Sequence, residues 1–143
     1  MNYMIAYLAF IGLILSGCQD KSTEPVKTID LKTFQLQTPA NWQSIAQIGY
    51  DSQVGSLTNG RDLLSYDYGW YSYDLRNEVS PDYVRTNMVI DGQTALLVRP
   101  KRRGTGVIGI YLLTKNQNRF VMSGTNIQDE ATVLKIFESI TFQ

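Results

Sequence analysis

Residues 83–98, YVRTNMVIDGQTALLV, carry a clear β-hairpin pattern. Two runs suited to β-strands, residues 83–90 and 93–98, flank the dipeptide Asp91-Gly92. A two-residue loop of this kind requires positive φ angles, which Asp and Gly tolerate, and it is a strong signal for a β-hairpin. The sequence therefore predicts two antiparallel strands near the middle of the chain.

More strands are expected on both sides of this hairpin. Downstream, residues 107–114 and 119–125 are two further apolar runs, joined by four polar residues that suit a hairpin loop. Upstream, residues 33–37 alternate between apolar and polar and are followed by Pro39, which ends regular pairing. We expect Trp42, just beyond it, to anchor the core at the entrance of a strand.

The pattern changes from strand to helix near the C-terminus. Within residues 129–139 and just after them, apolar residues recur at helical spacing, namely Val133, Leu134, Phe137 and Ile140. Residues 140–142 suit a short closing strand. The sequence thus predicts one α+β domain over residues 33–143, a mainly antiparallel β-sheet with a C-terminal helix packed on it.

The beginning of the chain has the features of a secretion signal. Residues 3–15 form an apolar run of thirteen residues, which is shorter than the roughly 20 that a transmembrane helix needs. The run ends in Leu15-Ser16-Gly17-Cys18, which resembles the bacterial lipobox. That resemblance implies that residues 1–17 are removed and that the thiol of Cys18 carries a diacylglyceryl group. Met1-Asn2 departs from the usual pattern, because it supplies no Lys or Arg.

This resemblance also implies a location in the cell envelope. Cys18 would anchor the chain to a membrane through lipid, with the domain in the periplasm or at the cell surface. Residues 18–32 are polar and charged, and we expect them to be a lipidated tether. The residue after the cysteine is Gln19 rather than Asp, which favours the outer membrane over retention at the inner membrane.

Composition narrows the classes of function. The chain carries 13 basic and 13 acidic residues, whereas a nucleic-acid-binding domain needs a net basic face. It has no histidine and a single cysteine, so the commonest general base and the usual zinc ligands are missing. We therefore expect no metal, no cofactor and no enzymatic activity.

The order of the expected elements resembles the PsbP-like fold. The resemblance rests on the strand with Phe34 and Pro39 before Trp42, on the Asp91-Gly92 hairpin, and on a terminal helix that runs into residues 136–142. The fold is shared by the extrinsic photosystem II protein, by a Ran-binding nuclear import factor and by small bacterial envelope lipoproteins. It implies a non-enzymatic binding or accessory domain.

One candidate contact surface is an aromatic stretch that follows a clean strand pattern over residues 61–70. It contains Tyr66, Tyr68, Trp70, Tyr71 and Tyr73. We expect Tyr66, Tyr68 and Trp70 to face the core. Trp70 and Tyr71 are neighbours, so in a regular strand they point in opposite directions, and one of them is the better ligand candidate. Exposed rings there would suit stacking on sugars.

The other candidate surface is the basic cluster of Arg99, Lys101, Arg102 and Arg103. Such a cluster can attract anionic lipid headgroups or an acidic protein partner. It can equally be a solvated loop whose charges keep the edge of a sheet soluble.

These observations lead to one leading hypothesis and three alternatives. The leading one is a lipid-anchored accessory domain that binds another protein of the envelope, with the basic cluster and any exposed aromatics as its contact surface. The alternatives are a glycan-binding module that uses the aromatics of residues 66–73, an immunity-type inhibitor of a toxin delivered to the periplasm, and, last, a hydrolase.

Overall fold

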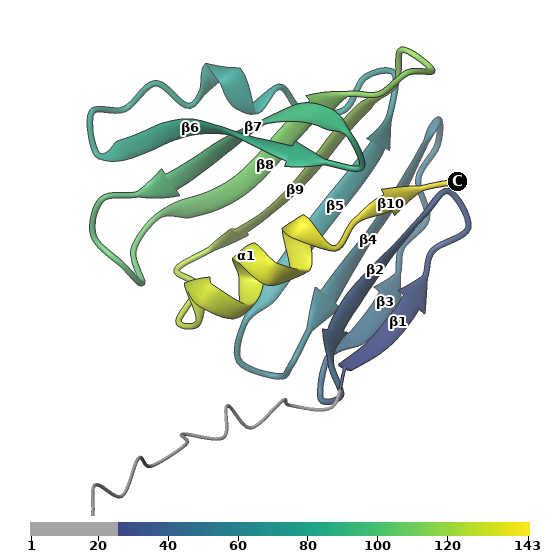
Figure 1. Cartoon of the computed structure of the whole chain (residues 1–143), viewed down its shortest axis with the longest axis horizontal. Coiled ribbons are helices and arrows are strands. Elements are labelled where there is room, and N and C mark those ends of the chain that lie inside the picture. Colours follow the sequence, from purple (N-terminus) through teal and green to yellow (C-terminus); the bar gives the residue numbers. More distant parts are fainter. Residues whose placement is uncertain (1–25) are drawn as a thin grey trace, which may run out of the picture.

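The computed structural model describes residues 26–143, and the expected signal peptide and Cys18 lie outside this part. Its strands and helices follow one another in a simple order (Figure 1). They are β1 (Val26–Asp30), β2 (Phe34–Pro39), β3 (Gln43–Ala46), β4 (Ser52–Thr58), β5 (Leu63–Gly69), the short 3-10 helix η1 (Leu75–Asn77), β6 (Tyr83–Ile90), β7 (Gln93–Pro100), β8 (Val107–Leu113), β9 (Arg119–Thr125), α1 (Glu130–Glu138) and β10 (Thr141–Phe142).

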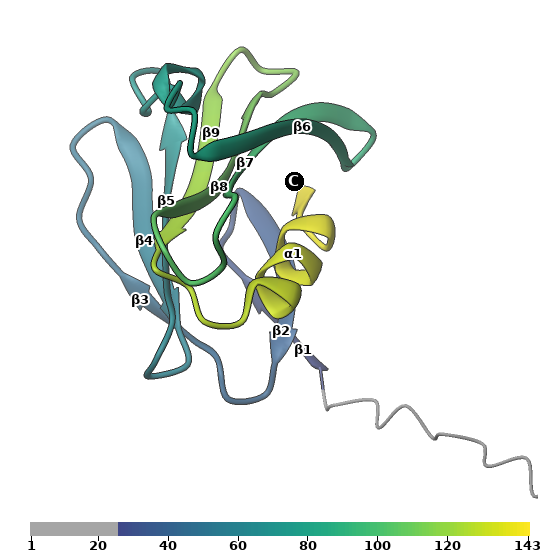
Figure 2. The ribbon, with the colours of Figure 1, turned by 90° about the vertical axis from the view of Figure 1, so that its left-hand side faces the viewer.

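The strands form two antiparallel sheets. The larger has seven strands in the order β3-β4-β5-β9-β8-β7-β6, and the smaller has three in the order β1-β2-β10. The small sheet and α1 lie together on one face of the large sheet (Figures 1 and 2). The α+β class, with mainly antiparallel sheets and one C-terminal helix, is therefore confirmed.

The hairpin predicted from residues 83–98 is present. β6 and β7 pair from Ile90 and Gln93 at the turn to Tyr83 and Pro100 at the open end. Asp91 and Gly92 have φ angles of 48° and 71°, the positive values that this two-residue turn requires. The β8–β9 hairpin, α1 and the closing strand β10 also form where the sequence predicts them.

The N-terminal part of the domain differs from the prediction. Val26–Asp30 was expected to belong to the tether, but it forms β1 and pairs along its whole length with β2. Its side chains are largely exposed, so its apolar pattern is weak, and backbone pairing with β2 holds it in place. β3 and β4 were not predicted as strands either, because polar residues dominate residues 43–58.

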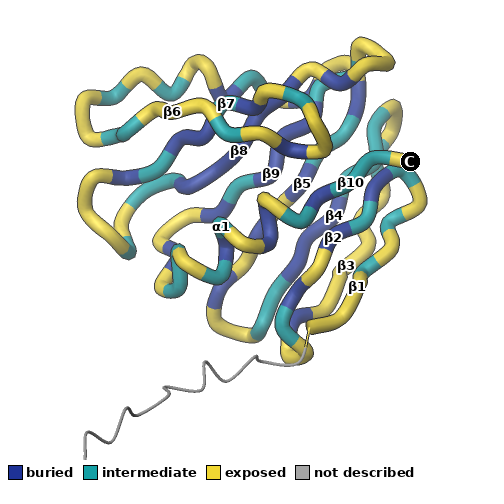
Figure 3. The backbone as a smooth tube through the Cα atoms, viewed as in Figure 1, coloured by how far each residue is buried: buried dark blue, intermediate teal, exposed yellow. Residues whose placement is uncertain are grey.

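The main core lies between the large sheet, the small sheet and α1 (Figure 3). Alternate residues of β2, β5 and β8 point into it, and the helix contributes the buried Val133, Ile136 and Phe137. Trp42 is 1% exposed, which confirms its expected role as a core anchor. Phe34 links the two sheets, because its ring packs edge-on against the rings of Tyr66, Tyr68 and Phe120.

A second, smaller core covers the opposite face of β7, β8 and β9. Residues 70–82 cross this face between β5 and β6, and η1 in their middle inserts Leu75 against Val98, Tyr111 and Val121. Leu75 is 2% exposed, so this connection is held to the sheet by apolar contact.

Candidate functional sites at the two ends of the sheet

The strands of the large sheet end at two opposite margins of the molecule. At one margin β8 begins after loop 101–106, where Val107 pairs with Thr125; we call this margin the basic end. At the other margin β5 ends at Gly69, which pairs with Ser52 and with Arg119; we call it the aromatic end. The two sets of candidate residues lie at different ends, so the structure does not bring them together.

The chain turns sharply where the aromatic stretch leaves β5. Tyr66 is buried and Tyr68 half-buried against the core, as predicted, but Trp70 is 60% exposed, so its expected inward orientation is wrong. The strand ends at Gly69, and Trp70 and Tyr71 occupy the turn that follows it. The regular alternation that would have turned Trp70 inward is therefore lost.

Ser72 fixes this turn. Its hydroxyl donates to a carboxylate oxygen of Asp67 at 2.8 Å and lies 3.2 Å from the carbonyl of Gly69, and the residue is 1% exposed. With Ser72 buried beneath the turn, the side chains of both Trp70 and Tyr71 remain in solvent. The sequence predicted only one of the two to be exposed.

Large apolar side chains gather in solvent at the aromatic end. Ile48 and Tyr50 precede β4, Trp70 and Tyr71 follow β5, and Leu113 ends β8. Ile48 and Tyr50 are fully exposed, and Tyr71 is 77% exposed. Strand pairing places these segments at the same end of the sheet. Ser52 pairs with Gly69, Gly69 pairs with Arg119, and Arg119 pairs with Leu113. The sequence pattern did not single out Ile48, Tyr50 or Leu113.

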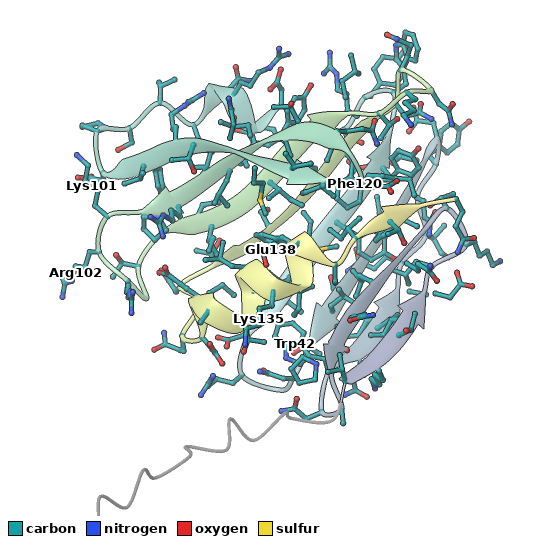
Figure 4. All side chains as sticks on the ribbon, in the orientation of Figure 1. Trp42, Lys101, Arg102, Phe120, Lys135 and Glu138 are labelled. Carbon is teal, nitrogen blue, oxygen red and sulfur yellow. The ribbon has the colours of Figure 1, made fainter. Side chains whose placement is uncertain are left out.

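The basic cluster lies partly in a strand and partly in the loop that follows. Arg99 belongs to β7 and is half-buried, whereas Lys101, Arg102 and Arg103 are exposed in the loop. Lys101 and Arg102 lie at the outer margin of the molecule (Figure 4). Among the described residues, none of these four cations forms a salt bridge.

A hollow of about 550 Å³ separates this loop from the end of the 70–82 connection. It is lined by Glu78, Ser80, Asp82, Tyr83, Pro100, Lys101, Arg102, Thr105 and Gly106. Its wall therefore carries two carboxylates and two cations, and it has no single electrostatic preference.

Hydrogen bonds hold loop 101–106, which we call the basic loop, in one conformation. The Lys101 N–H donates to the carbonyl of Asp82 at 2.8 Å, and the Gly106 N–H donates to the side-chain oxygen of Asn126 at 2.8 Å. Gly104 and Gly106 have φ angles of 74° and 77°, which favour glycine. The loop is thus tied on both sides, and its three cationic side chains project from an ordered backbone.

A second hollow, of about 240 Å³, lies at the N-terminal end of α1. It is lined by Pro39, Asn41, Asn59, Arg61, Asp129 and Thr132. Asp129 caps the helix by accepting the backbone N–H and the hydroxyl of Thr132 at 3.0 Å and 2.8 Å. These hydrogen bonds, with that of the backbone N–H first, lower the pKa of Asp129. Asp129 therefore occupies the positive end of the helix itself.

Asp62 is a residue whose role sequence reasoning missed. It is 2% exposed, and its carboxylate accepts the backbone N–H groups of Gln128 and Asp129 at 2.8 Å and 3.3 Å. Arg61 is its ion-pair partner at 3.2 Å. Nothing in the sequence around Asn59-Gly60 indicates that the following Asp62 accepts a hydrogen bond from a residue 66 positions away.

An ion pair orders the connection over the second core. Arg76 lies 2.5 Å from the carboxylate of Asp74, and its guanidinium stands over the ring of Tyr111 at 5.2 Å. The side-chain hydrogen bond from Arg76 lowers the pKa of Asp74. The role of these residues is structural, since they hold Leu75 against the sheet.

Within residues 26–143 no group of three or more acidic, cysteine or histidine side chains is placed to hold a metal ion. The same residues contain no helix long and apolar enough to span a membrane. Compared with known families and with curated proteins, the chain matches no family model and no curated sequence.

Proposed function

We propose that this chain is a lipid-anchored envelope lipoprotein whose domain binds another envelope protein through its aromatic end. The lipid is carried by Cys18, as the lipobox-like Leu15-Ser16-Gly17-Cys18 implies. The observation that supports the binding role most is the gathering of exposed apolar side chains at one end of the sheet, from Ile48 and Tyr50 to Trp70 and Tyr71.

Exposed apolar groups of this size are unfavourable in water unless a partner covers them. Burial contributes about 25 cal/mol for each Å² of apolar surface removed from water, and contiguous exposed apolar patches mark interaction sites. Trp and Tyr are enriched among the residues that dominate protein interfaces, because they bury a large area and keep a polar group for a hydrogen bond. A protein partner therefore suits this end better than solvent does.

The position of the aromatic end relative to the anchor also suits a partner. β1 begins at Val26 opposite Pro39, and β3 begins at Gln43 opposite Thr58. These residues belong to the margin where β5 begins, which is the basic end. A chain anchored before Val26 is attached at the end opposite its aromatic end, which leaves the aromatic end free to meet other envelope proteins.

A non-enzymatic role fits the two carboxyl groups whose pKa values are shifted. Asp74 and Asp129 both have lowered pKa values, and hydrogen bonds that hold the structure account for both. A catalytic general acid needs the opposite shift. For the domain itself, we propose a PsbP-like arrangement of the strands and the C-terminal helix, which is likewise associated with accessory functions.

The test is crosslinked co-purification of the lipidated protein from native membranes. We expect a specific envelope protein to be captured by the wild type and lost from the double variant Trp70→Ala, Tyr71→Ala. The matched control is Val89→Ala, which removes an apolar side chain that is 69% exposed on β6. Equal recovery with the double variant and with the control would overturn the binding role of the aromatic end.

The anchor is tested separately by metabolic labelling with a palmitate analogue. The wild type should incorporate the label, and Cys18→Ala should not. A wild type that remains unlabelled while it is exported would contradict the proposed lipidation.

A glycan is the second candidate ligand, and the exposure of both Trp70 and Tyr71 favours it. Because Trp42 is buried and Trp70 is exposed, Trp70 alone should respond to a ligand at this end. Titration with peptidoglycan fragments would then change the tryptophan fluorescence of the wild type but not of Trp70→Phe. The two hollows described above do not include these rings.

A further inference from the structure

The basic loop and the first described residue lie at the same end of the domain. Val26 pairs with Pro39, and the chain then turns into β3, whose first residue Gln43 pairs with Thr58. Thr58 pairs with Leu63 at the start of β5, and this margin continues across the sheet to Thr125 and Val107. Loop 101–106 precedes Val107, so it stands at the margin from which the chain runs toward Cys18.

From this placement we infer that the basic end docks on an anionic phospholipid surface through Lys101, Arg102 and Arg103. The inference rests on the proposed anchor at Cys18 and deepens it. The anchor attaches the protein to a bilayer, and the docking would set which side of the domain faces that bilayer.

The distance between the anchor and the domain is short. Seven residues separate Cys18 from Val26, and even a fully extended chain across that interval spans no more than about 29 Å. β5 has seven residues, so the aromatic end is about 23 Å farther along the sheet than the basic end. Electrostatic attraction to a charged surface falls off over about 8 Å at physiological ionic strength. The anchor therefore restrains the basic end more closely than the aromatic end, and attraction of the loop cations would keep the basic end within that range.

The charges at the basic end favour an anionic surface. Its loops and strand ends carry more cations than carboxylates. The cations are Lys27, Arg61, Arg99, Lys101, Arg102 and Arg103, and the carboxylates are Asp62, Glu78, Asp82, Asp129 and Glu130. The buried Asp62 is paired with the exposed Arg61, and Asp129 is engaged at the helix N-terminus. The five other cations then outnumber the three remaining carboxylates, Glu78, Asp82 and Glu130.

The loop is also shaped for contact with a surface. Its backbone is held by Asp82 and Asn126, as described above, and the hydroxyl of Thr105 donates to the carbonyl of Arg102 at 2.8 Å. Ordered cations lose less conformational freedom on binding than mobile ones. Each basic residue near an anionic membrane strengthens binding roughly fivefold, so three together are too weak to recruit a free protein but sufficient to orient an anchored one.

The single thiol of the chain allows a direct test. The mature chain, residues 18–143, is coupled through Cys18 to a maleimide lipid, so that the anchor is supplied chemically whether or not the cell lipidates this residue. The vesicles consist of phosphatidylcholine, with or without phosphatidylglycerol. Limited trypsin digestion then compares cleavage after residues 101–103, at the basic end, with cleavage after Lys115, which is exposed at the opposite end.

We expect phosphatidylglycerol to slow cleavage after residues 101–103 at least fivefold relative to cleavage after Lys115. The protection should disappear at about 1 M salt, where the screening length is near 3 Å. The variant Arg102→Gln, Arg103→Gln, followed by cleavage after Lys101, should lose most of the protection. The control Lys32→Gln removes an exposed cation in the turn after β1, at the opposite end, leaves Lys115 in place, and should retain the protection.

Two results would overturn the inference. One is a cleavage ratio that does not depend on phosphatidylglycerol. The other is a loop that stays unprotected on vesicles but is protected in native membranes by a crosslinked acidic protein. Neither result bears on partner capture by Trp70 and Tyr71, nor on the labelling of Cys18, so failure here is distinguishable from failure of the proposed function.

Discussion

The two ends of the large sheet are held together by different interactions. At the basic end, hydrogen bonds connect loops that are distant in the sequence, because the Asp62 carboxylate accepts the N–H groups of Gln128 and Asp129. At the aromatic end, rings pack beneath the exposed surface, with Phe34 against Phe120 at 4.9 Å. The basic end is therefore sensitive to the loss of polar partners, and the aromatic end to the loss of apolar volume.

The largest effect is expected from Phe34→Ala. Phe34 is fully buried, and its ring joins the small sheet to Tyr66, Tyr68 and Phe120 of the large one. Removing it should lower the free energy of unfolding by about 3 to 5 kcal/mol, measured by urea denaturation. A loss below about 1 kcal/mol would show that the rings do not hold this end together.

Asp62→Ala should have the next largest effect, at the other end. The change leaves the N–H groups of Gln128 and Asp129 without the acceptor that they have in the folded protein. We expect a loss of about 2 to 3 kcal/mol in the same measurement. Asp51→Ala removes an exposed carboxylate at the aromatic end and serves as the control, with little expected change.

Asp129→Ala should cost about 1 kcal/mol at neutral pH, because it removes the N-cap of α1. The pKa of Asp129 is lower in the folded protein than in the unfolded chain, so its contribution is complete above the unfolded value, near 4. It is lost as the pH falls through the lower folded value. The difference between wild type and variant should therefore shrink in acid.

Asp129→Asn provides the control for this pH dependence. Asparagine is a good N-cap but does not titrate, so the helix should keep most of its stability with a flatter dependence on pH. If the acid-induced loss were the same in Asp129→Asn as in the wild type, Asp129 would not be its source.

The smallest effect on stability is expected at the exposed surface of the aromatic end. Trp70→Ala and Tyr71→Ala should each change the free energy of unfolding by less than about 0.5 kcal/mol, because both rings lie in solvent. The same changes are expected to abolish partner capture. A large loss of stability would instead show that these rings stabilise the fold, and the expected difference between them and Phe34 would disappear.

Local sequence signals were sufficient to predict much of the fold. Asp91-Gly92 determines its own turn, because the positive φ angles are a property of the two residues themselves. The periodicity of α1 and the aspartate before it likewise determine a helix and its start. Strands with weak apolar patterns, such as β1, escaped prediction because pairing with a neighbour, rather than their own residues, stabilises them.

The candidate sites were predicted less completely than the fold. The sequence identified Trp70, Tyr71 and the basic cluster as the segments to examine, but it placed Trp70 in the core. It treated the two sets as one contact surface, although they lie at opposite ends. The exposed Ile48, Tyr50 and Leu113 carry no motif, so only their position beside Trp70 and Tyr71 makes them candidates.

By itself, the sequence determined the class of the domain, its turns and its C-terminal helix, because these depend on the conformations of neighbouring residues. Only the tertiary structure decided which end of the sheet each cluster occupies, because strand register is set by pairing between distant segments. It also decided that Trp70 and Tyr71 face solvent, through the buried Ser72 that bends the chain after Gly69.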